Sequence, residues 1–258
     1  KNKPDWTKLI TPEMAEVVAH IRQWNEEHPA TSNYLQDYMD ERVFWNDGGP
    51  VPAKVIEVEI EGPYGKIPCR LHYPRISDQP MGMMLYAHGG SLYLGNNDTH
   101  SRIMRTLTEK SDTVVIGVDY HLAPQNRFPK WIEECVVATK YFRAHAAEYG
   151  LDANDVSFAG DSAGAWLSMA TMLWLRDEDP DISYVTSLLL YYGLYGMYDS
   201  PTQRLYGNEI DGMMREYDEK LYPASIVDEE DVKSPHCDLL YNDLTQNVPP
   251  CFICTGTI

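Results

Sequence analysis

The chain has 258 residues, of which 43% are hydrophobic, and it carries 39 acidic against 21 basic side chains, a formal net charge of −18. This composition is typical of a globular protein, and its acidic excess disfavours nucleic acids, anionic membranes and polyanionic substrates as partners. The length suits one domain over residues 1–258, and no apolar run approaches the ~18–20 residues of a membrane span.

Two helices are predicted at the start of the chain. Thr11, Pro12 and Glu13 form a helix start, with a capping hydroxyl, a proline at the first helical position and an acid in the first turn. Apolar residues then recur on one face up to Trp24, and a second helical stretch covers residues 34–44. Because both precede any strand, we expect them to form part of a cap over about residues 1–45.

The strand pattern changes along the chain. Residues 54–60 alternate apolar and polar, a Gly-Pro-Tyr-Gly turn follows, and residues 69–73 complete a hairpin. Continuous apolar runs come next and alternate with helical segments. The runs are 83–87, 113–118, 156–159, 187–191 and 251–254, and the helical segments lie near 98–110, 131–149 and 163–176. Strands buried on both faces and separated by helices predict an α/β fold with a mostly parallel sheet flanked by helices.

A polar stretch over residues 199–240 separates the last two runs by far more than an ordinary crossover. We expect it to be a helical insertion over the strand ends, and thus the second half of the cap.

The five cysteines are Cys69, Cys135, Cys237, Cys251 and Cys254. Their odd number and scattered positions predict buried thiols rather than a disulfide framework. The last two have C-x-x-C spacing, but within a strand-like run, where they would not converge on a metal or in a redox turn. With no signal peptide at the start, the sequence predicts a cytoplasmic protein.

The first chemical motif is Gly160-Asp161-Ser162-Ala163-Gly164, between a predicted strand and a predicted helix. A Gly-x-Ser-x-Gly sequence in this setting is the nucleophile elbow of an α/β-hydrolase, in which a strained serine exposes its oxygen. The sequence therefore predicts Ser162 as a nucleophile.

The second motif, His88-Gly89-Gly90, follows a buried strand directly. At the carboxyl end of a parallel strand, such a glycine pair points backbone N–H groups into the crevice, where they can hold an oxyanion. We predict an oxyanion hole from the N–H groups of Gly89, Gly90 and Ala163, with His88 bracing the loop.

These motifs, in this order and with Asp119-Tyr120-His-Leu-Ala-Pro124 between them, resemble those of the hormone-sensitive-lipase-like α/β-hydrolases. Within that family the chain resembles the bacterial acetyl esterases nearly from end to end. The resemblance implies an α/β-hydrolase fold with a helical cap, and hydrolysis of short-chain acyl esters such as acetyl esters, without cofactor or metal. Two positions depart from the family pattern: Ser91 replaces a third glycine, and Gln125 replaces a frequent acid.

The resemblance also implies a triad acid and a histidine beyond residue 258, together with the last strand and helix of the fold. All eight histidines precede that position, and His236 is the only one after Ser162. We therefore expect this chain alone to be nearly inactive, because a serine without its base is a poor nucleophile.

Four further residues are predicted near the substrate: Asp161, Trp166, Tyr93 and Tyr195. Asp161 is a better candidate for stabilising the loop than for the triad. The sequence predicts a small-molecule ester as the partner, with no nucleic acid and no membrane, and it leaves a homo-oligomer open. Two alternatives remain, a catalytically dead binding protein on a hydrolase scaffold and an amidase or peptidase of the same fold.

Overall fold

The computed structural model describes residues 10–179, 181–196, 227–228 and 230–255. The chain starts with two helices, α1 (Pro12–Glu27) and α2 (Tyr34–Asn46). The Thr11 hydroxyl accepts a hydrogen bond from Met14 N at 3.3 Å and caps α1, as its sequence predicts. Both predicted helices are confirmed.

A single seven-stranded sheet follows, with the strand order β1-β2-β4-β3-β5-β6-β7. Its strands are β1 (Lys54–Gly62), β2 (Gly65–Tyr73), β3 (Met81–Ala87), β4 (Val114–Val118), β5 (Leu151–Asp161), β6 (Val185–Tyr191) and β7 (Cys251–Cys254). β1 and β2 form the predicted antiparallel hairpin, and β2 also pairs antiparallel with β4. β3 to β7 pair in parallel, so the predicted change from an antiparallel to a parallel sheet is confirmed.

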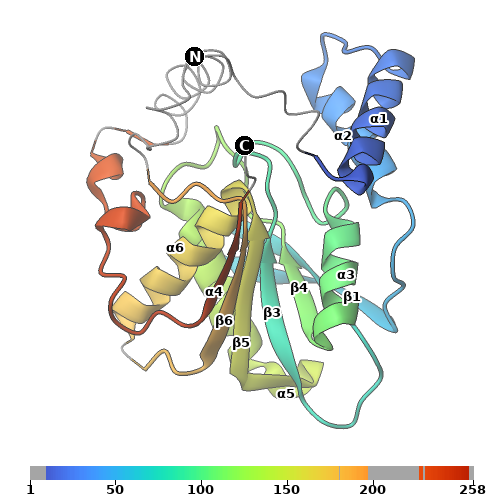
Figure 1. Cartoon of the computed structure of the whole chain (residues 1–258). Helices are drawn as coiled ribbons and strands as arrows, with labels where there is room; N and C mark the ends of the chain where they lie inside the picture. Colours follow the sequence, from blue (N-terminus) through green and yellow to red (C-terminus); the bar gives the residue numbers. More distant parts are fainter. Residues whose placement is uncertain (1–9, 180, 197–226, 229, 256–258) are drawn as a thin grey trace.

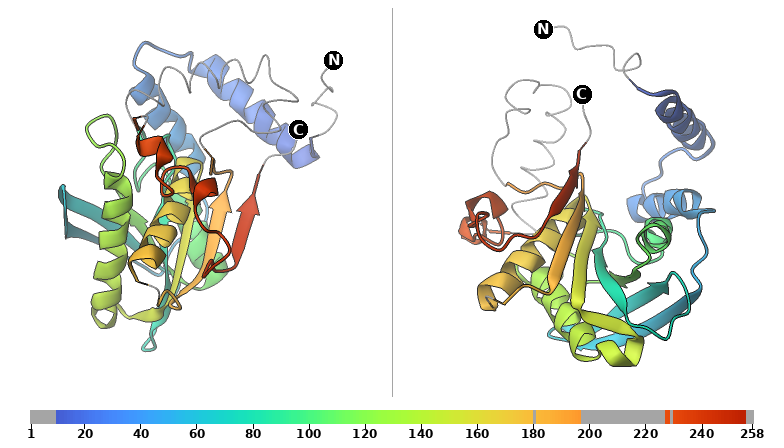
Figure 2. Two further views of the ribbon diagram at one scale, coloured as in Figure 1. Left: turned by 90° about the vertical axis from the view of Figure 1, so that its left-hand side faces the viewer. Right: turned by 60° about the horizontal axis from the view of Figure 1, so that its bottom comes forward.

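Helices cover both faces of the sheet (Figures 1 and 2). They are α3 (Ser101–Ser111), α4 (Lys130–Ala144), α5 (Ala146–Tyr149) and α6 (Ala163–Glu178). Alternate residues of one strand point to opposite faces. Met83 and Leu85 of β3 thus belong to the larger core, which α4 and α6 cover, whereas Met84 and Tyr86 belong to the smaller core beside α3.

The carboxyl ends of the parallel strands all lie at the same end of the sheet. At this end, α1 and α2 lie beyond the start of α3 (Figure 1). Of the predicted insertion over 199–240, the structure describes residues 227–228 and 230–240, which hold the 3₁₀ helices η2 (Asp231–Lys233) and, at their end, η3 (Leu239–Tyr241). Residues 199–226 and 229 lie outside the described residues, so the cap stays a prediction. Among the described helices, none has the length and apolar character of a membrane span.

Three of the five cysteines are buried, as predicted, but Cys251 and Cys254 are exposed. The prediction was wrong for these two because the apolar strand that holds them, β7, lies at the edge of the sheet and has one described neighbour, β6.

Candidate active site

Ser162 lies on a sharp turn between the end of β5 and the start of α6. Its backbone has φ 52° and ψ −121°, a conformation that costs a non-glycine residue about 1–3 kcal/mol. A hydrogen bond from Ser162 N to Tyr191 O, 2.8 Å long, holds the turn against the end of β6. The serine therefore has the strained backbone that its motif predicts.

The two glycines of the motif are required by close packing around this turn. A Cβ atom on Gly160 would lie 2.3 Å from the carbonyl oxygen of Gly164, and one on Gly164 would lie 2.0 Å from that of Ala87. Both contacts are with backbone, which cannot move aside cheaply. These positions bring the end of β5 and the first turn of α6 directly against the end of β3.

His88, at the end of β3, is buried and braces the following loop. Its Nδ1 donates to Gly89 O at 2.8 Å, and its ring stacks on Tyr120, whose hydroxyl donates to His88 O at 2.6 Å. Burial, and then the nearby His100, lower the pKa of His88 to about 4, so the ring is neutral near pH 7. The predicted bracing role fits this geometry.

The Asp161 carboxylate connects the two motifs. Its Oδ1 accepts hydrogen bonds from Tyr86 OH at 2.6 Å and from Gly89 N at 2.9 Å, and its Oδ2 lies 3.5 Å from His100 Nε2 and accepts from Tyr192 OH at 3.3 Å. Burial alone would raise the pKa of Asp161, but the hydrogen bonds from His100, Tyr86 and Gly89 outweigh it and lower the pKa to about 2. Asp161 is thus a buried anion that holds the glycine loop.

This contact changes the expected role of Gly89, because its N–H is already donated to Asp161. In the described part of the chain, the N–H groups of Gly90 and Ala163 have no acceptor. Ala163 N–H also opens the 16-residue helix α6, whose amino end favours negative charge. Of the three predicted oxyanion donors, these two are the ones without a described acceptor.

The three aromatic residues predicted to line a pocket differ in their surroundings. The indole of Trp166 is 3% exposed, lies in the main core and donates from Nε1 to Cys237 O at 2.9 Å, so it fastens the segment around Cys237 to α6. This corrects the prediction that Trp166 lines the pocket. Tyr93 and Tyr195 are half-buried and pack against the same core, and neither is placed against Ser162 by a described hydrogen bond.

None of the eight histidines, all of them within the described residues, forms a hydrogen bond with Ser162. His236 lies beside α6, where its Nε2 is 2.8 Å from Asp177 Oδ2 and its ring faces Trp174. His121 pairs with the buried Glu134. In the described residues, moreover, no cluster of His, Cys, Asp or Glu has the arrangement of a metal site.

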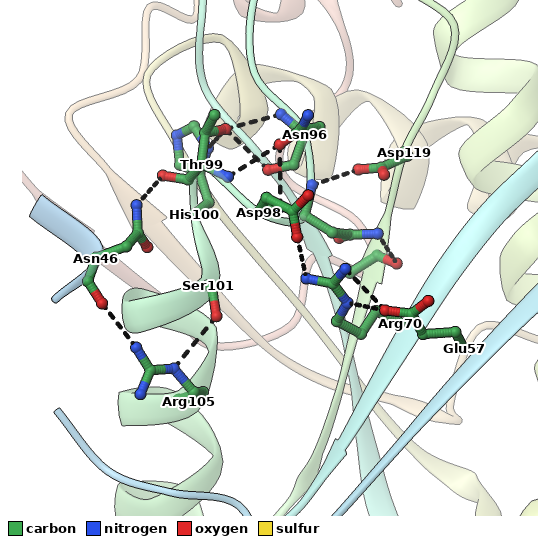
Figure 3. A network of polar contacts seen from close by, with 12 residues as sticks. Asn46, Glu57, Arg70, Asn96, Asp98, Thr99, His100, Ser101, Arg105 and Asp119 are labelled. Carbon is green, nitrogen blue, oxygen red and sulfur yellow. Dashed lines mark hydrogen bonds and ion pairs between the residues drawn. The ribbon is translucent and has the colours of Figure 1, made fainter. Parts of the chain in front are cut away.

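A cavity that the sequence did not predict opens beside Asp161. Its volume is about 380 Å³, and its lining includes Arg42 of α2, Arg102 of α3, and Tyr192. Asn46 fixes the end of α2 against the start of α3, because it donates to Thr99 O at 2.7 Å and accepts from Arg102 N at 2.7 Å. Figure 3 shows Asn46 between Thr99 and Arg105. No local sequence pattern signals this contact, since it joins residues more than 50 positions apart.

The profile of the α/β-hydrolase fold family matches residues 84–258. An acetyl esterase of Salmonella typhi is 45% identical to the chain over 221 residues, which are 86% of this chain and 68% of the relative.

Among solved structures, a thermostable carboxylesterase cloned from a metagenomic library is 27% identical, with a TM-score of 0.74 over 86% of this chain and 76% of its own. An esterase of the archaeon Pyrobaculum calidifontis is 24% identical, with a TM-score of 0.79 over 95% of this chain and 79% of its own, and shares the fold.

Proposed function

Because the chain belongs to the α/β-hydrolase family and groups with its bacterial acetyl esterases, we propose that it is a serine carboxylesterase for short-chain acyl esters, acetyl esters among them. The observation that carries this proposal is the strained turn at Ser162, together with two N–H groups that have no described acceptor, those of Ala163 next to it in the chain and of Gly90 after β3. An esterase needs this combination of an exposed nucleophile and prearranged donors.

In the proposed reaction, Ser162 Oγ attacks the ester carbonyl carbon and loses its proton. The carbonyl oxygen becomes an oxyanion that accepts hydrogen bonds from Gly90 N and Ala163 N. Collapse of this intermediate expels the alcohol, which takes up a proton, and leaves an acyl group on Ser162. Water then attacks the acyl-enzyme through a second such intermediate and releases the acid.

Two residues support the reaction without touching the substrate. Asp161 holds the glycine loop through Gly89 N, and the neutral His88 holds it through Gly89 O. Losing one oxyanion donor typically costs about 10²–10³ in rate, so the position of this loop matters for activity.

No histidine of the 258-residue chain forms a hydrogen bond with Ser162, and we therefore expect this chain alone to turn over esters slowly. Removing such a base lowers turnover about 10⁶-fold, and the oxyanion donors with substrate binding retain about 10³–10⁴-fold over water. We further propose a small-molecule ester as the partner and the cytoplasm as its location.

The test uses 4-nitrophenyl acetate, butyrate and decanoate, followed by labelling with a fluorophosphonate and measurement of the intact mass. We expect slow turnover above the buffer rate, greatest for the short acyl chains, and slow labelling at one site, with the label lost in Ser162→Ala. The matched control Ser77→Ala, on an exposed loop, should keep both. A label that persists in Ser162→Ala would overturn the serine mechanism, and 4-nitroacetanilide hydrolysed faster than the ester would favour an amidase.

A further inference from the structure

We propose that Arg42 is a subsite for a carboxylate group, so that the preferred substrates are esters carrying a free carboxylate. This proposal rests on the esterase function above and names the substrate class within it. It is carried by the position of Arg42 between two cavities and by its lack of an acidic partner.

Arg42 lies at the edge of two neighbouring cavities. The cavity of about 380 Å³ reaches from Arg42 to Asp161, the residue directly before the nucleophile. The second, of about 500 Å³, lies between α1 and α2 and shares Arg42, Asn46 and Thr99 with the first. The guanidinium of Arg42 thus lines the same cavity as Asp161, one residue along the chain from Ser162.

Arg42 forms no ion pair with any described residue, and its Nε is buried without a hydrogen-bond partner. Among the described arginines, Arg42 shares such a buried Nε only with Arg127. By contrast, Arg70 pairs with Glu57 and Asp98, and Arg75 pairs with Asp112. A buried donor without an acceptor is costly, and a planar guanidinium matches a carboxylate in a two-bond contact.

The position of Arg42 is fixed before any ligand binds. Its guanidinium lies over the ring of Tyr38, 4.9 Å from the ring centre. The end of its helix is held by Asn46, which donates to both Arg42 O and Thr99 O at 2.7 Å. Figure 3 shows this link to the start of α3. A fixed side chain loses little entropy on binding, which favours affinity.

The acid that lines the same cavity does not take the place of the ligand. Asp161 is already held by hydrogen bonds from Tyr86 and Gly89 and lies beside His100. Arg102 adds a second positive group to the lining. The chain as a whole repels anions, so a local positive site is what would let it select an anionic ester.

The first experiment compares matched esters at low ionic strength. The acyl-side pair is 4-nitrophenyl hydrogen glutarate and 4-nitrophenyl valerate, and the alcohol-side pair is 4-acetoxybenzoate and its methyl ester. We expect the anionic member of at least one pair to be preferred, and Arg42→Gln to lower its kcat/KM about tenfold or more, mainly through KM. The neutral esters should change less than twofold. Arg42→Lys should keep part of the preference, and Arg75→Gln, which removes one charge elsewhere, all of it.

The second experiment measures binding without turnover. The probe is 4-oxopentanoate, and its neutral isostere is 5-methylhexan-2-one, both titrated by calorimetry into the wild type and Arg42→Gln. We expect 4-oxopentanoate to bind about tenfold more weakly to Arg42→Gln and the ketone to be unaffected. Circular dichroism and thermal unfolding check that the variant is folded.

The two experiments separate the two proposals. Arg42-dependent binding of 4-oxopentanoate without hydrolysis of any ester keeps the carboxylate subsite and removes the esterase function. Ester hydrolysis with equal kcat/KM for charged and neutral partners, together with binding of 4-oxopentanoate that is absent or unchanged in Arg42→Gln, overturns the subsite and leaves the esterase intact.

Discussion

Gly89 N–H donates a 2.9 Å hydrogen bond to Asp161 Oδ1, and this bond joins the ends of the neighbouring strands β3 and β5. The residue before the nucleophile thereby fixes the loop that follows His88. The variable position of the Gly-x-Ser-x-Gly motif thus has a structural role, because the carboxylate keeps the serine turn and the glycine loop in one arrangement.

Replacing Asp161 with Asn should destabilise the protein by about 2 kcal/mol at pH 7, which is the free energy that corresponds to its lowered pKa of about 2. The Asn amide would keep an oxygen for Tyr86 OH and Gly89 N, but it would turn its NH₂ group toward Tyr192 OH and His100 Nε2. Urea unfolding measures the loss. The control Asp112→Asn breaks the exposed ion pair with Arg75 and should cost less than about 1 kcal/mol. An equal effect of the two substitutions would contradict this account of Asp161.

The pH dependence of stability should depend on His72, which is buried in β2 with its Nδ1 unpartnered. Burial, and then the charges of Arg70 and Arg105, lower the pKa of His72 to about 4. Between pH ~6.5 and 4 the unfolded chain binds a proton that the folded chain does not, so stability is lost as the pH falls through this window. His72→Leu should reduce the slope there by about 1.4 kcal/mol per pH unit.

Urea unfolding at pH 4.5, 5.5 and 6.5 gives this slope for His72→Leu and the wild type. Above pH 7 the curves of the two proteins should run parallel, because the imidazole is neutral in both states. An unchanged slope between pH 4.5 and 6.5 would show that His72 does not resist protonation.

Asp119 should act with the opposite sign. Burial raises its pKa to about 6, although Asn97 N donates to its Oδ1 at 2.6 Å. Between pH ~4 and 6 the folded chain holds a proton that the unfolded chain has lost, so this group makes stability fall as the pH rises. The free energy of unfolding of Asp119→Asn, relative to that of the wild type, should therefore be about 2 kcal/mol higher at pH 7 than at pH 4. Thermal unfolding at the two pH values measures this difference, and a gain at pH 4 instead would refute it.

Arg176 should hold the segment that leads to β7. Its guanidinium is nearly buried and donates to Asp243 O at 2.6 Å, Gln246 O at 3.1 Å and Asn242 Oδ1 at 2.5 Å. Arg176→Gln should destabilise the chain by about 2–3 kcal/mol, because three acceptors lose the charged donor that the buried arginine supplies. Amide hydrogen exchange should then accelerate over residues 239–254 more than in β3. Arg75→Gln serves as the exposed control, and uniform acceleration across the sheet would count against a local anchor.

The order of helices and strands could be predicted from the sequence because local periodicity and capping residues carry it. Thr11 and Pro12 mark the start of α1, and the alternation over residues 54–60 marks an edge hairpin. Ser162 was likewise predictable, since its strained turn needs glycine on both sides.

Contacts between distant segments could not be predicted in this way. The sequence marks Gly89 as a loop glycine, but which acceptor its N–H meets depends on Asp161 lying opposite. Trp166 was expected near the substrate, yet its position on α6 turns it into the core. The link between Asn46 and Thr99 and the cavity beside Arg42 depend in the same way on how α2 meets α3.

The edge strand β7 leaves Phe252 57% and Ile253 54% exposed, next to backbone groups with no described strand beyond them. Such an edge is a template on which strands of other molecules can add. The charge of −18 keeps molecules apart in dilute buffer. Salt screens this repulsion, because the Debye length falls from ~10 Å at 0.1 M salt to ~3 Å at 1 M. Concentrated salt should therefore let folded molecules of this chain pair through their β7 edges. Their solutions should then become turbid at temperatures below that of unfolding.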